Sequence, residues 1–469
     1  PAFDIVGLPD KAVKESRERV RAATKNSGFQ FPVNRITINL APADIKKIGP
    51  HYDLSIAAGI LSAQGIIAKS ILKKYLIIGE LSLTGEVRSV KGVLPMVLKL
   101  KKEGLKGVIL PYDNYNEASL VEDIKIIPVK NLKEVVNFIN HKSVPKNIKV
   151  KSRSNKENDA HQLYKIDFAD IKGQEEARRA LEVAAAGGHN ILMVGPPGSG
   201  KTMLAERLST ILPPLTEDEA LELTKIYSVL GLSDAEKGLI KKRPFRAPHH
   251  SISAAGLIGG GRIPEPGEVS LAHKGTLFLD EMPEYNRDVL EMLRQPLEAS
   301  EVTIVRSVMS ATFPANIMLV AAMNPCPCGY YGDERHECHC SVPKINRYRD
   351  KVSGPLMDRI DIHIEVPGLS VKEITGESKG ESSSIIKKRV MSAHKIQLLR
   401  YKNEKFDHNS QLKGKNLKTY CQLDYDSVEL LKQAIEDLGL SARAYDRILR
   451  LARTISDLEA DKNIKSEHI

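Results

Sequence analysis

A glycine-rich segment constrains this chain more than any other feature. Residues 195–202 read Gly-Pro-Pro-Gly-Ser-Gly-Lys-Thr, and residues 190–194 before them are apolar enough to form a short buried strand. A strand, a glycine-rich turn and a helix in this order form a loop whose backbone N–H groups bind phosphate. We therefore expect a parallel α/β sheet with a nucleoside triphosphate at its edge.

The residues of this loop have separate expected roles. Glycines permit the tight turn, Lys201 reaches the β- and γ-phosphates, and the Thr202 hydroxyl binds Mg²⁺. A glycine-rich turn that binds nothing is the alternative, but every fixed position of the motif is matched. The predicted ATP-binding residues are Gly195, Pro196, Pro197, Gly198, Ser199, Gly200, Lys201 and Thr202.

Two later strands are expected to end in polar residues at the same sheet edge. The apolar run 277–279 leads into Asp280, which would hold Mg²⁺ through water, and Glu281, which would orient and deprotonate the attacking water. An Asp-Glu pair alone is commonly a solvated turn, and the upstream loop is what favours a catalytic role. The run 316–322 leads to Asn324, a candidate for holding the lytic water.

Composition limits the class of protein. At 469 residues, about two to four domains are expected. The chain has no long uninterrupted apolar run and no signal peptide, which favours a cytoplasmic protein with no membrane partner. It begins at Pro1, so the natural N-terminus is expected to lie upstream. The net charge is +10, and the whole excess lies in residues 1–150. A basic domain attached to an ATPase favours a polyanionic partner such as nucleic acid, and a merely solvated basic face is the alternative.

Four of the five cysteines form a compact pattern of two Cys-x-Cys pairs: Cys326, Cys328, Cys338 and Cys340. In a reducing compartment this pattern favours a metal over disulfides, and four thiolates complete a tetrahedral Zn²⁺ shell. Free thiols are the alternative, and His336 and His339 could replace two of the ligands. Cys421 is expected to be an isolated thiol.

Hydrophobic periodicity predicts a multidomain α/β chain. Strand-like and helical runs alternate over residues 1–140, and the polar stretch 141–165 is expected to be a linker. An α/β core with a parallel sheet is expected over 166–370, with a cysteine-rich loop at 324–341. A second linker is expected at 371–384, and helical periodicity over 385–469 predicts an all-α lid.

Several motifs together resemble the YifB/ComM family of magnesium-chelatase-like AAA+ ATPases. They lie along almost the whole chain, at residues 4–9 (Asp-Ile-Val-Gly-Leu-Pro), 246–251 (Arg-Ala-Pro-His-His-Ser), 324–329 (Asn-Pro-Cys-Pro-Cys-Gly), 354–359 (Gly-Pro-Leu-Met-Asp-Arg) and 440–445 (Leu-Ser-Ala-Arg-Ala-Tyr). The resemblance implies a Lon-protease-like α+β first domain, a helix-2-insert AAA+ module and a helical lid.

The Lon-like domain raises the possibility of peptidase activity, which its residues oppose. The nucleophilic serine of that fold falls at Asp53 and its lysine partner at Leu94. Aspartate forms no acyl-enzyme and leucine is no base. A shifted alignment would offer Ser55 with Lys91. The domain is therefore expected to bind or assemble rather than to cleave.

The resemblance also implies roles for residues outside the two nucleotide motifs. Ile171, Gly173 and Gln174 match the loop that packs around adenine. Arg359 matches the arginine finger that a neighbouring subunit supplies, and Arg443 matches the lid arginine called sensor 2, acting within the subunit or on its neighbour. Both arginines imply a nucleotide-dependent homo-hexamer.

Two insertions are expected to face the central pore of such a ring. They span residues 246–273 and 302–313, each as a hairpin, with Arg262, Lys274 and Arg306 as their few basic residues. We therefore expect a hexameric ATPase that moves branched or single-stranded DNA, similar to the ComM branch-migration helicases. The alternatives are a motor like that of magnesium chelatase, which remodels a metal-insertion partner, and a protein-remodelling or assembly ATPase.

Overall fold

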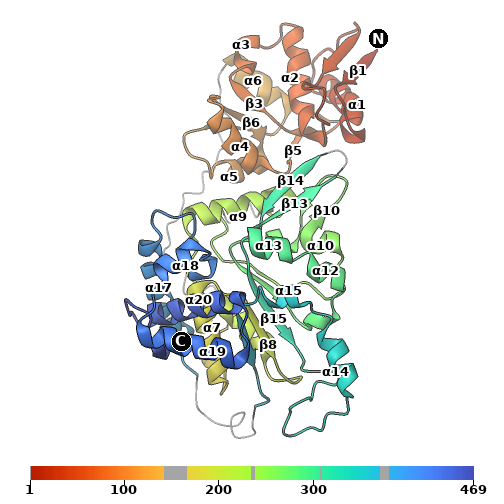
Figure 1. The fold of residues 1–469 in the computed structure, drawn as a ribbon. Helices are drawn as coiled ribbons and strands as arrows, with labels where there is room; N and C mark the ends of the chain where they lie inside the picture. The colour runs from red at the N-terminus through yellow and green to blue at the C-terminus, as the bar shows by residue number, and fades with distance from the viewer. Residues whose placement is uncertain (1, 142–165, 234–237, 307–308, 370–379) are drawn as a thin grey trace. The chain divides into compact units, whose positions relative to one another are not determined.

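The computed structural model describes residues 2–141, 166–233, 238–306, 309–369 and 380–469 (Figure 1). Contacts divide the chain into two compact units. The first contains Pro1–Asn155 with Ala220–Ile240, and the second contains Lys156–Glu219 with Lys241–Ile469. The expected linker at 141–165 lies almost wholly outside the described residues, as does most of the one at 371–384.

The first unit is built on three parallel strands in the order β3-β6-β7, with a parallel β1–β2 pair and an antiparallel β4–β5 pair beside them. One face of the three-stranded sheet packs against α2 and α6, and the other against α4 and α5. Its elements are β1 (Phe3–Val6), α1 (Lys11–Asn26), β2 (Ile36–Asn39), η1 (Pro50–Tyr52), α2 (Asp53–Ala63), α3 (Lys69–Leu72), β3 (Tyr75–Ile77), β4 (Glu80–Leu81), β5 (Val87–Arg88), α4 (Val93–Lys102), β6 (Gly107–Pro111), η2 (Tyr112–Asn114), α5 (Tyr115–Ala118), β7 (Lys125–Val129) and α6 (Leu132–His141).

Helix α9 (Glu217–Leu230) corrects the expected domain division. Sequence analysis placed all of 166–370 in one core, whereas residues from Ala220 onward pack in the first unit. Leu221 joins the apolar cluster around α4, and the Ser228 hydroxyl donates to the buried Glu117 carboxylate. A segment that sequence analysis placed in the 166–370 core therefore completes the core of the first unit.

The second unit contains a five-stranded parallel sheet in the order β16-β8-β15-β12-β9, with helices on both faces. Strand β15 lies between β8 and β12, so the segments that follow these three strands leave the sheet along one edge. The elements are η4 (Phe168–Asp170), α7 (Glu175–Gly187), β8 (Ile191–Val194), α8 (Lys201–Ile211), β9 (Phe245–Arg246), α10 (Ala254–Ile258), β10 (Gly259–Gly260), β11 (Glu265–Pro266), α11 (Glu268–Leu271), β12 (Thr276–Leu279), η5 (Met282–Glu284), α12 (Arg287–Glu291), α13 (Arg294–Ala299), β13 (Glu301–Val305), β14 (Ser310–Pro314), β15 (Met318–Met323), α14 (Val342–Arg349), α15 (Gly354–Met357) and β16 (Ile362–Glu365).

The C-terminal part of the second unit is helical, drawn in blue in Figure 1. Helices α17 and α20 pack against each other and against α7, which covers the parallel sheet. The amphipathic pattern of α20 accounts for this, because Leu451, Ile455 and Leu458 pack against the apolar cluster that holds residues of α7 and α17, while Leu449 and Ala452 are buried in the lid. The elements are α17 (Ser383–Arg400), η6 (Asn409–Gln411), α18 (Lys415–Tyr420), α19 (Tyr425–Leu438), α20 (Ala442–Leu458) and η7 (Ser466–His468).

Candidate ATPase site

The glycine-rich loop joins β8 to α8, as its sequence predicts. Gly198 and Gly200 have φ of 77° and 89°, a left-handed conformation that favours glycine. Gly195 is required for a different reason, because a Cβ there would lie 2.1 Å from the Val366 carbonyl oxygen. The loop backbone therefore depends on all three glycines.

Lys201 is held inside this loop. Its Nζ donates to the Gly195 and Pro196 carbonyl oxygens, both at 2.8 Å, and lies 3.4 Å from Asn324 Oδ1. Burial lowers the pKa of Lys201, while the negative charges of Asp280 and Glu281 act in the opposite direction. An ammonium with few water contacts gains most from an anionic ligand, since a phosphate restores its lost solvation.

The acidic pair lies at the same edge of the sheet. Thr202 Oγ1 donates to Asp280 Oδ2 at 2.7 Å, so the two predicted Mg²⁺ ligands are adjacent. Glu281 follows at φ 49°, in the left-handed region, and its exposed carboxylate is 3.6 Å from His250 Nδ1. Sequence reasoning noted the motif that contains His250 but assigned it no role beside Glu281.

The segment expected to pack around adenine is tied to the phosphate loop. Gly173 and Gln174 both have positive φ, and Gln174 Nε2 donates to the Pro367 carbonyl at 2.6 Å, with the Ser199 carbonyl at 3.5 Å. Ile171 is fully buried in the core around α7. The structure therefore brings this segment beside the residues that follow β16 and the phosphate loop.

Arg359 and Arg443 lie together at the opposite edge of the sheet. The Asn190 side-chain amide donates to the Arg359 carbonyl at 2.9 Å, and Asn190 directly precedes β8. The Arg359 guanidinium is paired with Glu298, and Arg443 Nη1 donates to Asp358 Oδ2 at 2.8 Å. The hydrogen bonds and ion pairs of these two arginines run to Asn190, Pro355, Glu298 and Asp358, and not to the phosphate loop of their own chain.

Three comparisons place the chain in a family. Models of magnesium chelatase subunit ChlI match residues 1–114 and 167–374, and the model of its C-terminal region matches 380–469. Competence protein ComM of Haemophilus influenzae is 44% identical over all of this chain and 91% of its own length. Protein YifB of Salmonella typhimurium is 42% identical over all of this chain and 90% of its length.

The chain belongs to the YifB/ComM family of magnesium-chelatase-like AAA+ ATPases. Its first part is also similar to Lon protease 2 of Bacillus subtilis, with 37% identity over 27% of this chain and 22% of that protein. These relationships agree with the Lon-like first unit and the AAA+ sheet described above.

The Lon-like unit of this YifB/ComM member has an ion pair at the position expected for a nucleophile. Asp53 is fully buried and accepts hydrogen bonds from Arg19 Nε at 2.6 Å and from the Leu81 amide at 3.2 Å. The Ser55 hydroxyl donates to the Tyr52 carbonyl at 2.8 Å, while the Lys91 side chain packs beside Gly231. A Ser55–Lys91 pair is not formed.

The four clustered cysteines converge as the sequence predicts, with all four sulfur atoms within 4.8 Å of one another. Cys326 Sγ is 3.3 Å from Cys328 Sγ and 3.7 Å from Cys338 Sγ. Four sulfurs bonded to one Zn²⁺ at about 2.3 Å would be about 3.8 Å apart, so the spacing fits a tetrahedral ion. His336 lies beside Asp333 and Tyr330 instead, outside this cluster.

The cysteine loop touches the phosphate loop. A Cβ at Gly329, whose φ is 90°, would lie 2.6 Å from Pro197 Cδ. Arg335 Nη1 and Nη2 donate to the carbonyls of Leu369 and Gly368, beside the Gln174 contact at Pro367. Sequence reasoning did not foresee this support, because nothing in the spacing of the cysteines indicates what their loop packs against.

The two expected pore insertions pack together, with one correction. Strands β13 and β14 of the second insertion pair antiparallel, and Arg306 Nε lies 3.3 Å from the Gly261 carbonyl in the other insertion. The 246–273 insertion is not a simple hairpin, because it forms α10, a two-residue ladder β10–β11 and α11.

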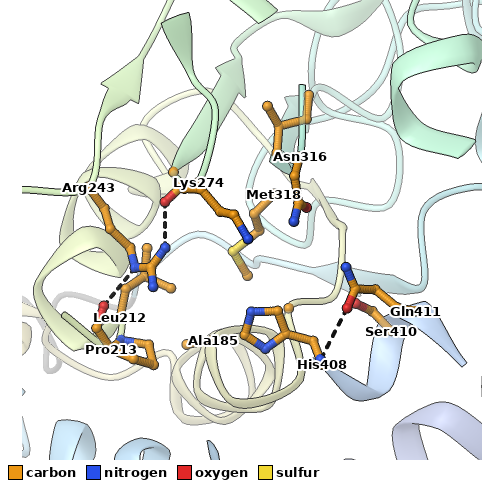
Figure 2. Close-up of a pocket in the computed structure, with 13 residues that line it drawn as sticks. Ala185, Leu212, Pro213, Arg243, Lys274, Asn316, Met318, His408, Ser410 and Gln411 are labelled. Carbon is orange, nitrogen blue, oxygen red and sulfur yellow. Dashed lines mark hydrogen bonds between the residues drawn. The ribbon is translucent and has the colours of Figure 1, made fainter. Parts of the chain in front are cut away.

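Lys274 is not in a pore loop. Its Nζ lies 3.3 Å from Glu219 Oε1 and 3.8 Å from Asp407 Oδ2, and its side chain is only 16% exposed. It lines a cavity of about 60 Å³ together with Arg243 and His408, where the ATPase core meets the lid (Figure 2). Lys274 therefore links the lid to the core, because its ammonium group lies between the carboxylates of Glu219 in the core and Asp407 in the lid.

None of the helices in the described parts of the chain is both long and apolar enough to cross a bilayer.

Proposed function

We propose that this protein hydrolyses ATP at a site shared between neighbouring subunits of a ring, and that it uses the cycle to move DNA. The observation that supports hydrolysis most strongly is the arrangement at one sheet edge, where Thr202 Oγ1 donates to Asp280 Oδ2 and Lys201 lies near enough to Asp280 and Glu281 for their charges to act on its pKa. The predicted nucleotide-binding motifs alone do not establish this geometry.

The residues of this chain divide the work of phosphoryl transfer. Lys201 and the loop N–H groups are placed to hold the β- and γ-phosphates. Thr202 and Asp280 would hold Mg²⁺, which would neutralise charge on the phosphate oxygens. Glu281 takes the proton of the attacking water, and Asn324 orients that water. His250, beside Glu281, is placed to orient this carboxylate.

The arginines act on the neighbouring subunit. Arg359 and Arg443 lie near the amino end of β8, whereas the phosphate loop follows its carboxyl end. In a closed ring, the face that carries these arginines meets the next subunit's phosphate loop, so that ATP hydrolysis requires assembly. A homo-hexamer is the proposed state.

DNA is the proposed substrate of the motor. The competence protein ComM is 44% identical over this whole chain, and the excess positive charge lies in residues 1–150. Within the second unit, the paired insertions present Arg306 and Arg262 near glycine backbone that can approach a sugar-phosphate chain closely.

We further propose that Cys326, Cys328, Cys338 and Cys340 bind one Zn²⁺. The ion would fix the cysteine loop and, through Gly329, support Pro197 of the phosphate loop. Its role is structural, because four thiolates leave no position for a reacting group.

The test is ATP turnover with four-way junction, single-stranded and duplex DNA across a salt series. Junction or single-stranded DNA should raise turnover, and the effect should weaken as salt rises, because phosphate contacts release counterions. Arg306→Ala should reduce stimulation and the salt slope, while the exposed Arg287→Ala serves as its control. Turnover that no DNA changes would contradict the DNA assignment and leave the ATPase assignment standing.

The same assay addresses the alternative of a chelatase-like or protein-remodelling motor. In that case a partner protein, rather than DNA, would raise the turnover rate. If DNA left the basal rate unchanged, the first unit would be the expected binding site for that partner protein.

A further inference from the structure

A groove of about 880 Å³ lies on the first unit, apart from the residues assigned to ATP hydrolysis. Strand β3 forms its floor, and its walls come from η1 with α2, the end of α3, and α4. The lining is mainly apolar and aromatic, and includes Tyr52, Tyr75, Leu76, Met96, Leu100 and Leu105. These apolar side chains line an open groove and are not covered by the protein itself. The lining therefore indicates a ligand with apolar side chains.

The floor of the groove is an open sheet edge. In the order β3-β6-β7, β3 pairs with β6 alone among the described strands. The Ile78 amide donates to the Ile109 carbonyl, and the Lys74 carbonyl accepts from the Lys106 amide, so even-numbered positions face β6. The N–H and C=O groups of successive residues point to opposite sides of a strand. Those of Tyr75 and Ile77 therefore point away from β6, toward the groove. These N–H and C=O groups can form hydrogen bonds with the backbone of an added extended segment.

The rim of the groove is positively charged. Lys73 and Lys99 line it, and Lys74 and Lys106 adjoin lining residues in the sequence; all four are exposed. Glu103, which is 3.7 Å from Lys99, is the acidic side chain among the lining residues. A ligand that carries carboxylates beside its apolar residues matches this charge.

The start of α2 beside the groove offers no means of cleaving a peptide. Asp53 is held by Arg19, and the Ser55 hydroxyl is directed to the Tyr52 carbonyl without a lysine base. A peptide in the groove would therefore be bound and released intact.

We propose that this groove is a docking site for an extended, acidic segment of a partner polypeptide, which adds a strand to β3 and inserts alternate apolar side chains between α2 and α4. Strand addition gives the affinity through backbone hydrogen bonds, and the groove selects side chains. This proposal does not rest on ATP hydrolysis or on DNA as the motor's substrate.

Gly59 can be replaced to fill the groove without destabilising the first unit. It lies in α2, lines the groove and is exposed, and a Cβ there would meet nothing within 4 Å. Gly59→Leu therefore fills the groove while replacing a poor helix former with a good one. Ala63→Leu, also exposed on α2 but outside the groove, is the matched control.

The experiment selects peptides from a phage-displayed library of random dodecapeptides on the full chain. We expect enriched sequences with alternating apolar residues and added Asp or Glu. Gly59→Leu should weaken their binding by roughly tenfold or more, as expected for loss of a well-packed contact region, while Ala63→Leu should not. N-methylation of alternate peptide amides should abolish binding, whereas N-methylation of the intervening ones should not.

Three results would overturn the proposal. The first is no enrichment on the full chain, and the second is enriched peptides that bind Gly59→Leu as tightly as the unchanged protein. The third is binding of a dodecathymidylate oligonucleotide that Gly59→Leu abolishes and Ala63→Leu does not, because this would assign the groove to single-stranded DNA.

Discussion

The Asn190 side chain donates a hydrogen bond to the Arg359 carbonyl at the end of β8 that lies away from Lys201. Four residues of β8 separate Asn190 from the phosphate loop, a rise of roughly 13 Å at about 3.3 Å per residue. Arg359 is also held by Glu298 and the Pro355 carbonyl. This separation supports the proposal that the arginine and the phosphate loop of one chain serve two different nucleotides.

Glu281→Gln should separate ATP binding from hydrolysis. The amide keeps the shape of the side chain but cannot accept the proton of the attacking water. We expect ATP affinity to be retained and turnover to fall by roughly 10²- to 10⁴-fold. Binding of a fluorescent ATP analogue and phosphate release measure the two effects. Glu284→Gln, an exposed carboxylate one 3₁₀ turn after Glu281 that pairs with Lys351, is the control; equal turnover in both variants would contradict the assignment.

Replacement of Cys326 and Cys328 by serine should remove the metal and weaken ATP binding together. Elemental analysis should find about one zinc per chain before the change and much less after it. ATP affinity should fall because Gly329 and Arg335 no longer hold the phosphate loop and the segment after β16 in place. Cys421→Ser, outside the cluster, should keep its zinc. A chain purified without chelator that contains no metal would contradict the zinc proposal.

Acidification should weaken the joint between the ATPase core and the lid. Burial lowers the pKa of His408 to about 4, against an ordinary value near 6.5. The unfolded chain therefore binds the proton more readily between these values, and the stability contributed by neutral His408 is present above about pH 6.5 and is lost as pH falls toward 4. The charged or titratable groups around this imidazole are Asp407, His394, Arg243, Lys274 and Glu219.

Comparison of His408→Gln with the unchanged protein isolates this contribution. The free energy of unfolding of the unchanged protein should decline more steeply between pH 6.5 and 4.5, by on the order of 1–3 kcal/mol. Denaturant titrations at each pH measure it. His141→Gln, an exposed histidine at the end of α6, should leave the slope as it was. Parallel slopes for His408→Gln and the unchanged protein would show that His408 does not titrate in this way.

Local sequence patterns predicted the strands and the glycine-rich loop at the candidate site, because each of these parts is encoded within a few residues. The strand before Gly195 and the apolar run before Asp280 both appear in the sheet, and helices α17 to α20 form in the region 385–469 that was predicted to be an all-α lid. The polar residues at the ends of parallel strands then meet by geometry alone.

Contacts between distant segments could not be predicted in the same way. The amphipathic pattern of α9 does not indicate which core its apolar face packs against. In the structure, the part of α9 from Ala220 onward packs in the first unit. Lys274 looked like a pore residue because it follows an insertion, whereas its partners Glu219 and Asp407 are far away in sequence. Such pairings depend on the assembled fold.

The most direct test of the shared site mixes two inactive variants. Lys201→Ala lacks ATP binding and Arg359→Ala lacks the finger, so each alone should show little turnover, with a loss of roughly 10³-fold or more for the finger. In mixed rings, an Arg359→Ala subunit with an intact phosphate loop can meet a Lys201→Ala subunit with an intact Arg359. We predict that mixing the two restores turnover to a substantial fraction of that of the unchanged protein. Verified mixed rings with no more activity than the sum of the separate variants would contradict a site completed by the neighbouring subunit.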